Sequence, residues 1–154
     1  MRYKTPVSVL VLLHTADLDI LLLERARHPR FWQSVTGSQE DGESLLQTAL
    51  REVREETGIA PKAPDLVDWR QSNRYEIFPE WRHRYAPGVT HNEEHVFSLL
   101  VANRNVPVQI APDEHLHAQW LGWRDAAAAC FSWTNRDAIL ALPHMIQERR
   151  QGSD

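Results

Sequence analysis

The sequence contains one cysteine, Cys130, and no apolar run near the ~18 residues that a transmembrane helix requires. A single cysteine excludes an internal disulfide and a thiolate-rich zinc site, so Cys130 is expected to be a buried small residue. The sequence also lacks an excess of positive charge. It has 17 Lys and Arg against 21 Asp and Glu, a net charge of −4. This balance excludes a general electrostatic attraction to nucleic acid or to anionic membranes.

Internal repeats, low-complexity tracts and linkers are also missing, which predicts a single domain over residues 1–154. The N-terminus has a basic start followed by the apolar run 7–13, an arrangement that signal peptides share. It lacks a small-x-small cleavage site, and His14 and Asp17 follow immediately. A first β-strand in a cytoplasmic protein is therefore the better interpretation.

Periodicity predicts an α/β fold with a mixed sheet that helices cover on both faces. A helix is expected from Ser44 to a C-terminal cap at Gly58, and a final helix with Asn135 as its cap. The first helix carries an apolar stripe at helical spacing, formed by Leu45, Leu46, Ala49, Leu50 and Val53. Strands are expected at 7–13, 20–25, 31–36, 66–73, 75–78, 95–101 and 119–122, the first two as a hairpin.

Acidic residues crowd the other side of the first helix. Glu52 lies three and four residues before Glu55 and Glu56, so the three carboxylates are neighbours. Close carboxylates repel by ~1 kcal/mol or more per pair unless water or a cation separates them. Mg²⁺ relieves such repulsion, because it prefers carboxylate, water and phosphate oxygens. The alternative is a solvated helix face whose glutamates pair with Arg51 and Arg54.

The spacing around this helix favours the metal site. Gly, five residues, Glu, seven residues and then Arg-Glu-aliphatic-x-Glu-Glu-x-Gly-aliphatic occupy residues 37–59. At average residue frequencies of roughly 6 %, the seven fixed identities coincide on the order of once in 10⁹ placements. The stretch resembles the signature of the Nudix hydrolases at every position. The resemblance implies a Nudix-type α/β/α sandwich with a catalytic loop-helix, and attack of water on one phosphorus of a diphosphate. It also implies Mg²⁺ as cofactor, with Mn²⁺ as an alternative.

The same resemblance implies roles for individual residues. Gly37 would offer its backbone carbonyl to the metal. Glu52 and Glu56 would bind the metal directly, and Glu55 directly or through water. Arg51 would orient the glutamates.

Two further acids take roles from the resemblance. Glu43 would tie the loop to the helix through an internal ion pair. Glu114, which precedes the late strand, resembles the additional metal ligand of many Nudix enzymes; its alternative is an exposed loop acid. The general base varies in the family, and Glu52 and Glu114 are both candidates.

Other stretches resemble one subfamily, the bacterial dihydroneopterin triphosphate diphosphatases. They are residues 3–9, 31–37, 75–78, 82–90 and 132–136. The implied reaction converts 7,8-dihydroneopterin triphosphate to the monophosphate and pyrophosphate, a step in folate biosynthesis. The first alternative is a Nudix (deoxy)nucleoside triphosphate pyrophosphatase. The second is a non-catalytic nucleotide-binding module, which usually lacks glutamates of the signature. The expected partner is a small-molecule triphosphate, and the oligomeric state does not follow from the sequence.

A pterin triphosphate needs cations for its phosphates and a flat pocket for its ring. Lys4 and Arg25 are candidates for the phosphates, or else surface cations. The candidates for the ring are Tyr75 and Phe78 for stacking, Glu76 as an acceptor, backbone groups of Ile77, and the hydroxyls of Thr36 and Ser132. The alternative for the aromatic residues is a place in the core.

Overall fold

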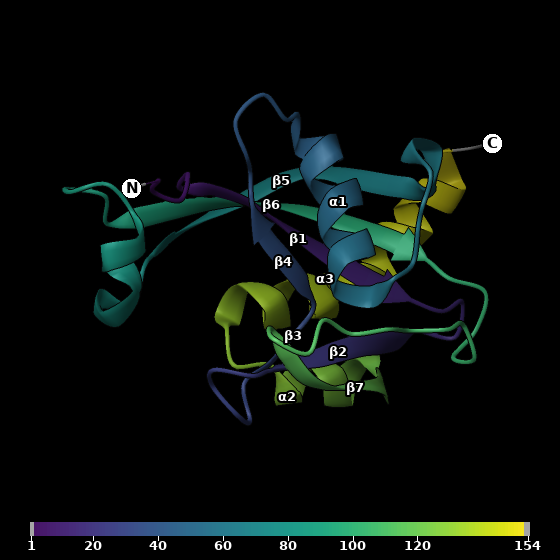
Figure 1. Ribbon diagram of the computed structural model, residues 1–154. Helices are drawn as coiled ribbons and strands as arrows, with labels where there is room; N and C mark the ends of the chain where they lie inside the picture. The colour runs from purple at the N-terminus through teal and green to yellow at the C-terminus, as the bar shows by residue number, and fades with distance from the viewer. Residues whose placement is uncertain (1, 153–154) are drawn as a thin grey trace.

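The computed structural model describes residues 2–152, and it consists of a mixed β-sheet between two layers of helix (Figure 1). The fold class expected from the sequence is confirmed. In chain order the elements are β1 (Val7–His14), β2 (Asp19–Arg25), β3 (Trp32–Gln33), β4 (Val35–Ser38), α1 (Leu45–Thr57), η1 (Ala63–Asp65), β5 (Leu66–Glu76), η2 (Pro79–Arg84), β6 (His91–Leu100), β7 (His115–Gly122), α2 (Trp123–Ala129) and α3 (Trp133–Gly152), where η marks a short 3₁₀ helix.

Strand β1 is the centre of the sheet. It pairs in parallel with β6, from Val7 opposite Glu93 to His14 opposite Leu100, and antiparallel with β4. Strand β6 pairs antiparallel with β5, and β2 pairs antiparallel with β3 and β7. The expected hairpin is reduced to one register pair, His14 opposite Ile20, because β2 follows β7 for the rest of its length.

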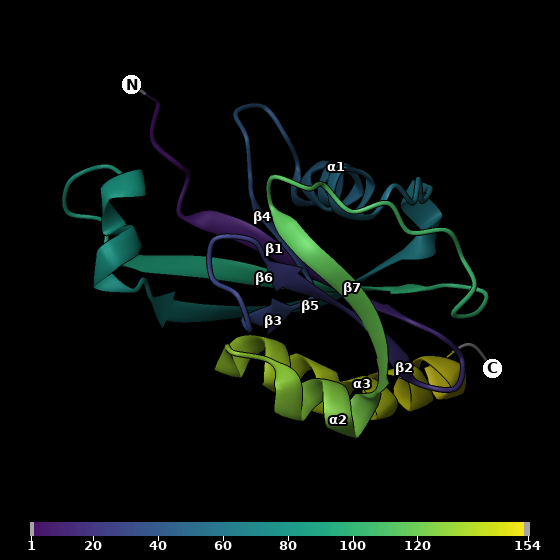
Figure 2. The ribbon, with the colours of Figure 1, turned by 60° about the horizontal axis from the view of Figure 1, so that its bottom comes forward.

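The two faces of β1 pack against different helices, as Figure 2 shows with α1 on one side of the sheet and α2 and α3 on the other. Val9 and Val11 lie in the core beneath α1, whereas Leu10 and Leu12 lie in the core beneath α2 and α3. Both faces are therefore covered, which explains why this strand is a continuous apolar run without polar alternation.

Helix α1 begins and ends where its sequence predicts. Ser44 caps the N-terminus through a capping box with Gln47, and Gly58 closes the C-terminus in the left-handed conformation at φ 76°. Ala49 and Val53 are fully buried against the sheet. The expected apolar stripe is confirmed, and the opposite side of the helix is left for polar groups.

Several expected elements differ in detail. The strand at 31–36 is interrupted at Ser34, because the Ser34 N–H donates to Asn135 Oδ1 at 2.7 Å instead of joining the ladder. The expected cap at Asn135 is wrong for the same reason: its side chain binds Ser34, and Ser132 Oγ accepts the Asn135 N–H. Residues 66–76 form one strand with an irregularity near Arg70, whose φ is 55°. Strands β6 and β7 begin earlier than expected, and α2 was not expected.

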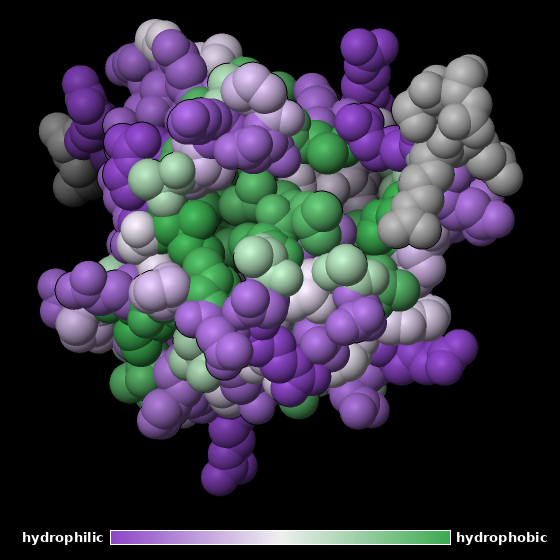
Figure 3. All heavy atoms as spheres, turned by 90° about the vertical axis from the view of Figure 1, so that its right-hand side faces the viewer, coloured by the Kyte–Doolittle hydropathy of each residue, from purple (hydrophilic) through white to green (hydrophobic). Residues whose placement is uncertain are grey.

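The face on the right-hand side of Figure 1, seen directly in Figure 3, carries apolar side chains gathered in a shallow hollow. A small pocket of about 350 Å³ lies between the β1–β2 turn and α3, lined by Ala16, Leu18, Pro143, Ile146 and Gln147. None of these five residues lines the large cavity described below. Within residues 2–152, no helix combines the length and the apolar character that crossing a membrane requires.

Candidate active site

A cavity of about 970 Å³ opens between α1, the sheet and the N-terminal end of α3. Its volume lies within the range of small-molecule sites. It brings together most residues that the sequence singled out: Lys4, Arg25, Thr36, Gly37, Glu52, Glu56, Tyr75, Glu76, Ile77, Phe78, Glu114 and Ser132. Arg51 and Glu55 lie outside its lining. Cys130 also lines the cavity; it is half-buried, and burial raises the pKa of its thiol to about 12.

Gly37 and Glu52 are in close contact at one wall of the cavity. Gly37 lies opposite Val9 in the β1–β4 ladder, which holds its backbone beneath α1. A side chain at Gly37 would overlap the Glu52 carboxylate, whose carbon would lie well inside van der Waals contact with an added Cβ. A larger residue here would therefore displace the Glu52 carboxylate, which is the flexible end of its side chain.

Glu52 and Glu56 are one helical turn apart, and both are buried although they carry carboxylates. Burial raises the pKa of both groups, and for Glu56 the neighbouring Glu52 raises it further. Glu56 is 1 % exposed, and its Oε2 has no hydrogen-bond partner among the described residues. Glu55, in contrast, is exposed. Glu52 is paired with Arg51, whereas Glu56 has no arginine or lysine partner among the described residues, and a cation would stabilise such a buried acid.

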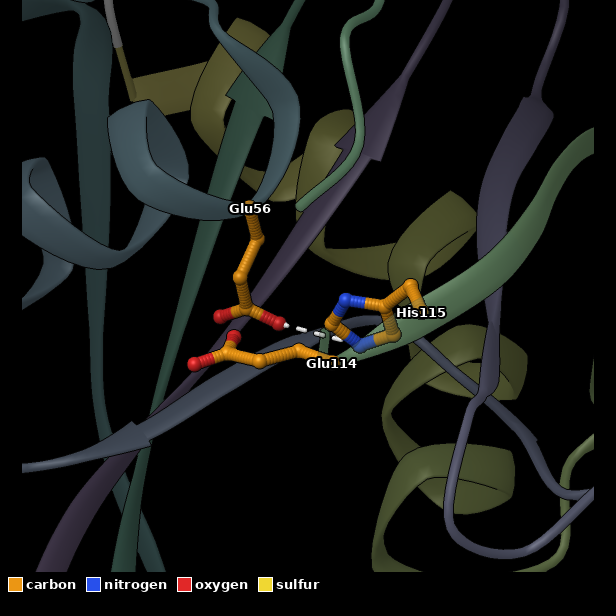
Figure 4. A group of neighbouring side chains, drawn as sticks. All are labelled: Glu56, Glu114 and His115. Atoms are coloured by element: carbon orange, nitrogen blue, oxygen red, sulfur yellow. Dashed lines mark ion pairs between the residues drawn. The ribbon is translucent and has the colours of Figure 1, made fainter. Parts of the chain in front are cut away.

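Glu114, directly before β7, and His115, the first residue of β7, approach Glu56 (Figure 4). Ligand atoms of the three residues lie within 4.8 Å of one another, and His115 Nε2 is 3.4 Å from Glu56 Oε1. Burial, followed by the charge of Arg25, lowers the pKa of His115 to about 4. The imidazole is therefore neutral at pH 7, as a metal ligand must be. His115 was not singled out from the sequence, where its position directly after Asp113-Glu114 was the available signal.

Arg51 connects the loop before α1 to the acids of the helix. Its Nε and Nη2 donate to the two oxygens of Glu43 at 2.6 and 2.9 Å, and its Nη1 donates to Glu52 at 2.6 Å and Glu55 at 3.3 Å. The Arg51 hydrogen bonds are the main cause that lowers the pKa of Glu43 to about 2. The expected internal pair between Glu43 and the helix is therefore present. Among the described residues, no arginine pairs with Glu56.

Three cations gather at the same cavity. Burial is the main cause that lowers the pKa of Lys4, and the charges of Arg84 and Arg25 lower it further. Lys4, Arg25 and Arg84 are therefore neighbours. The Arg25 guanidinium lies over the Trp81 ring, 4.7 Å from its centroid. Trp81 was not singled out from the sequence, and Arg84 lies in the stretch 82–90, to whose residues the sequence assigned no role. Such a cluster of cations beside carboxylates fits a polyanion that is shared with a metal.

Four of the residues expected around a ring are consecutive: Tyr75 and Glu76 end β5, and Ile77 and Phe78 lie between β5 and η2. The Tyr75 hydroxyl accepts from Asn92 Nδ2 at 3.0 Å, and the Glu76 carboxylate pairs with Arg82. The Ile77 N–H donates to Thr90 at 2.8 Å and its carbonyl accepts from Arg82 at 3.0 Å, so these backbone groups already have partners.

The remaining candidates for the ring are Phe78, Thr36 and Ser132. Phe78 is 44 % exposed and packs on Trp81 with a 4.9 Å centroid separation. Thr36 accepts from Gln33. Ser132 accepts the Asn135 N–H at the start of α3.

Asn92 and Glu94 are two buried polar residues of the cavity that the sequence did not single out. They alternate on β6 with Glu93 and His95, and Val96 of the core continues the same face. A charged residue in the buried register of a strand was the available signal. It went unused because the strand was expected to begin at His95.

Comparison with known proteins agrees with this geometry. The family model of the NUDIX domain matches residues 4–142. The dihydroneopterin triphosphate diphosphatase of Escherichia coli K12 is 47 % identical over 140 residues, covering 89 % of this chain and 91 % of that protein. The protein of the same name from Haemophilus influenzae is 40 % identical over 142 residues, covering 90 % and 88 %.

A solved structure supports the same assignment. The structure of the E. coli dihydroneopterin triphosphate pyrophosphohydrolase has a TM-score of 0.83 and 45 % identity, and the match covers 90 % of this chain and 95 % of that one. The family model and these relatives each span most of the chain, and the cavity holds glutamates of the signature. The chain therefore belongs to the Nudix family.

Proposed function

We propose that this chain hydrolyses 7,8-dihydroneopterin triphosphate to the monophosphate and pyrophosphate, with Mg²⁺ as cofactor. The observation that carries the proposal is the likeness, over nearly the full length, to two relatives named for that activity, at 47 % and 40 % identity. The cavity supports it, because one continuous space contains both acids for a metal and groups for a ring.

The acids of the cavity fit a divalent ion, which Nudix hydrolases use. Glu56 has a buried oxygen without a partner among residues 2–152, and the Glu52 carboxylate lies against the Gly37 backbone. Oxygen donors of this kind favour Mg²⁺. Glu52, Glu56, Glu114 and the Gly37 carbonyl would hold the ion, and Glu55 would act through water. Once bound, the ion would neutralise phosphate charge and lower the pKa of a bound water.

The other residues would position the triphosphate and the attacking water. Lys4 and Arg25 would bind phosphate oxygens, and the Trp81 ring keeps the Arg25 guanidinium in place. Arg51 would fix the Glu52 carboxylate through their 2.6 Å contact. A proton of the attacking water would pass to Glu52 or Glu114, the two candidate bases.

The test is a substrate panel with Mg²⁺, in which pyrophosphate release is followed for dihydroneopterin triphosphate and for the common (deoxy)nucleoside triphosphates. The proposal expects the highest kcat/KM with the pterin, loss of activity in EDTA and its return with Mg²⁺. Faster turnover of a nucleoside triphosphate would instead assign a nucleotide pyrophosphatase. Binding without any turnover would assign a nucleotide-binding module.

A further inference from the structure

The wall of the cavity formed by β5, β6 and the first turn of α3 contains buried polar groups that the hydrolytic step does not use. Asn92 and Glu94 line this wall together with Tyr75, Ser8 and Thr134. Glu94 lies opposite Ser8 in the β1–β6 ladder and shares a strand face with Val96, in the core beneath α2 and α3. The adjacent Phe97 belongs to the core beneath α1. Glu94 therefore lies on the face of the sheet opposite α1.

Glu94 is a buried acid without an ion-pair partner among the described residues. It is 5 % exposed, and its Oε1 has no hydrogen-bond partner within residues 2–152. Burial raises its pKa to about 7, and the Thr134 hydroxyl acts in the opposite direction. A buried acceptor without a donor is unfavourable, and folded proteins rarely retain one without a reason.

Asn92 supplies a second acceptor two residues away on the same strand face. Its amide nitrogen donates to Ser8 Oγ at 2.8 Å and to the Tyr75 hydroxyl at 3.0 Å. Both amide hydrogens therefore have partners, whereas its Oδ1 has none in the part of the chain that the structure describes. Asn92 is 2 % exposed. The wall thus contains two buried acceptors that have no donor in the described part of the chain, and both belong to residues that line the cavity.

The donors of a 2-amino-4-oxo ring match a carboxylate. In pterin and in guanine, the 2-amino group and the adjacent ring N–H point in the same direction, so one carboxylate can accept from both. Adenine places an acceptor nitrogen beside its amino group, and uracil has one N–H between two carbonyls. Neither of these two edges gives a carboxylate a pair of donors.

We propose that Glu94 selects the ring of the substrate by accepting hydrogen bonds from the 2-amino and ring N–H groups of a 2-amino-4-oxo heterocycle, with Asn92 Oδ1 as an adjacent acceptor. This inference rests on the proposed function for the pterin itself. It extends to guanine nucleotides, because they share the same edge. Glu94 is a specificity residue, separate from the acids that surround Glu56.

The experiment compares the wild type, Glu94→Gln and the control Glu93→Gln. Glu93 is the exposed neighbour on the other face of β6 and does not line the cavity. Binding of dihydroneopterin triphosphate, dGTP and dATP to the metal-free protein is measured by calorimetry, and kcat/KM with Mg²⁺ is measured for the same three. The Gln variant replaces one acceptor by a donor. It is expected to lose about 10- to 100-fold in affinity and kcat/KM for the pterin and dGTP, and less than about 3-fold for dATP.

An equal loss for all three ligands, or no loss, would overturn the inference, and so would a wild type that binds none of them. Selective loss with dGTP but no pterin turnover by the wild type would reject the proposed function and retain the role of Glu94. Pterin turnover by the wild type without a selective loss in Glu94→Gln would retain the proposed function and reject the role of Glu94. Should Glu94→Gln fail to fold, Glu94→Asp, which withdraws the carboxylate by one methylene, must show the same selectivity for the inference to stand.

Discussion

The carboxylate of Glu52 lies so close to the backbone of Gly37 that any side chain at position 37 would overlap it. Strand β4, which contains Gly37, is paired with β1, whereas the Glu52 carboxylate is the end of a flexible side chain. The strand is therefore the fixed partner, and the carboxylate is the one that must move if space is lost. Glycine at position 37 therefore leaves free the space that the Glu52 carboxylate occupies.

Gly37→Ala is accordingly expected to slow hydrolysis strongly while the fold survives. The added methyl group displaces the Glu52 carboxylate, and we expect pyrophosphate release to fall about 100-fold or more, with a near-native circular dichroism spectrum. Gly122→Ala is the matched control, because an added Cβ there meets no atom within 4 Å. Normal turnover by Gly37→Ala would contradict a metal site at this wall.

Glu56→Gln is expected to lower activity without lowering the stability of the metal-free protein. Removing the charge should lower turnover by about 100-fold or more, because an amide binds Mg²⁺ more weakly than a carboxylate. The unfolding temperature of the metal-free protein should stay the same or rise, because Glu56 is 1 % exposed and has an oxygen without a partner among residues 2–152. Pyrophosphate release and thermal unfolding in EDTA measure the two effects. Glu148→Gln, at an exposed position of α3, is the control. Unchanged turnover by Glu56→Gln would reject the assignment.

Loss of the Glu43–Arg51 pair should make the unfolding temperature depend less on pH in the acidic range. The pKa of Glu43 in the folded protein is about 2, below its usual value of 4.5, so its contribution is present above pH 4.5 and disappears as the pH falls toward 2. Glu43→Gln should therefore lower Tm at pH 7 by about 2–4 °C, with the difference from wild type shrinking below pH 4. Thermal unfolding from pH 2.5 to 7 measures this, with the exposed Glu80→Gln as control. A difference that stays constant across this range would contradict the pKa shift.

Glu94→Gln should have the opposite pH signature. The pKa of Glu94 is raised from 4.5 to about 7, so its carboxyl adds no penalty below pH 4.5, destabilises the fold increasingly between pH 4.5 and 7, and adds a constant penalty above pH 7. The variant should match the wild type at pH 4.5 and be more stable at pH 8, by on the order of 2–3 kcal/mol. Denaturant unfolding at the two pH values, with Glu93→Gln alongside, measures the difference. A variant less stable than wild type at pH 8 would show that Glu94 is stabilised by partners in the protein.

Local patterns predicted much of this fold. The capping box at Ser44, the left-handed Gly58 and the apolar stripe of α1 depend on residues within a few positions of one another, so their sequence signals are complete. Strand β1 was recognisable because burial on both faces requires a continuous apolar run. Boundaries failed where a distant side chain decides them: Asn135 interrupts the strand at Ser34, 101 residues away in the chain.

The sequence by itself determined the family signature and with it the acids Glu52, Glu55 and Glu56, because helical spacing fixes which side chains are neighbours. Only the tertiary structure decided which acids lie inside. It buries Glu52 and Glu56, exposes Glu55, and brings Glu114 and His115 to Glu56 through the β2–β7 register. It also decided that Glu94 is a buried acceptor in the same cavity. The physical reason is that burial and long-range proximity arise from packing between elements, which residue spacing along one element does not encode.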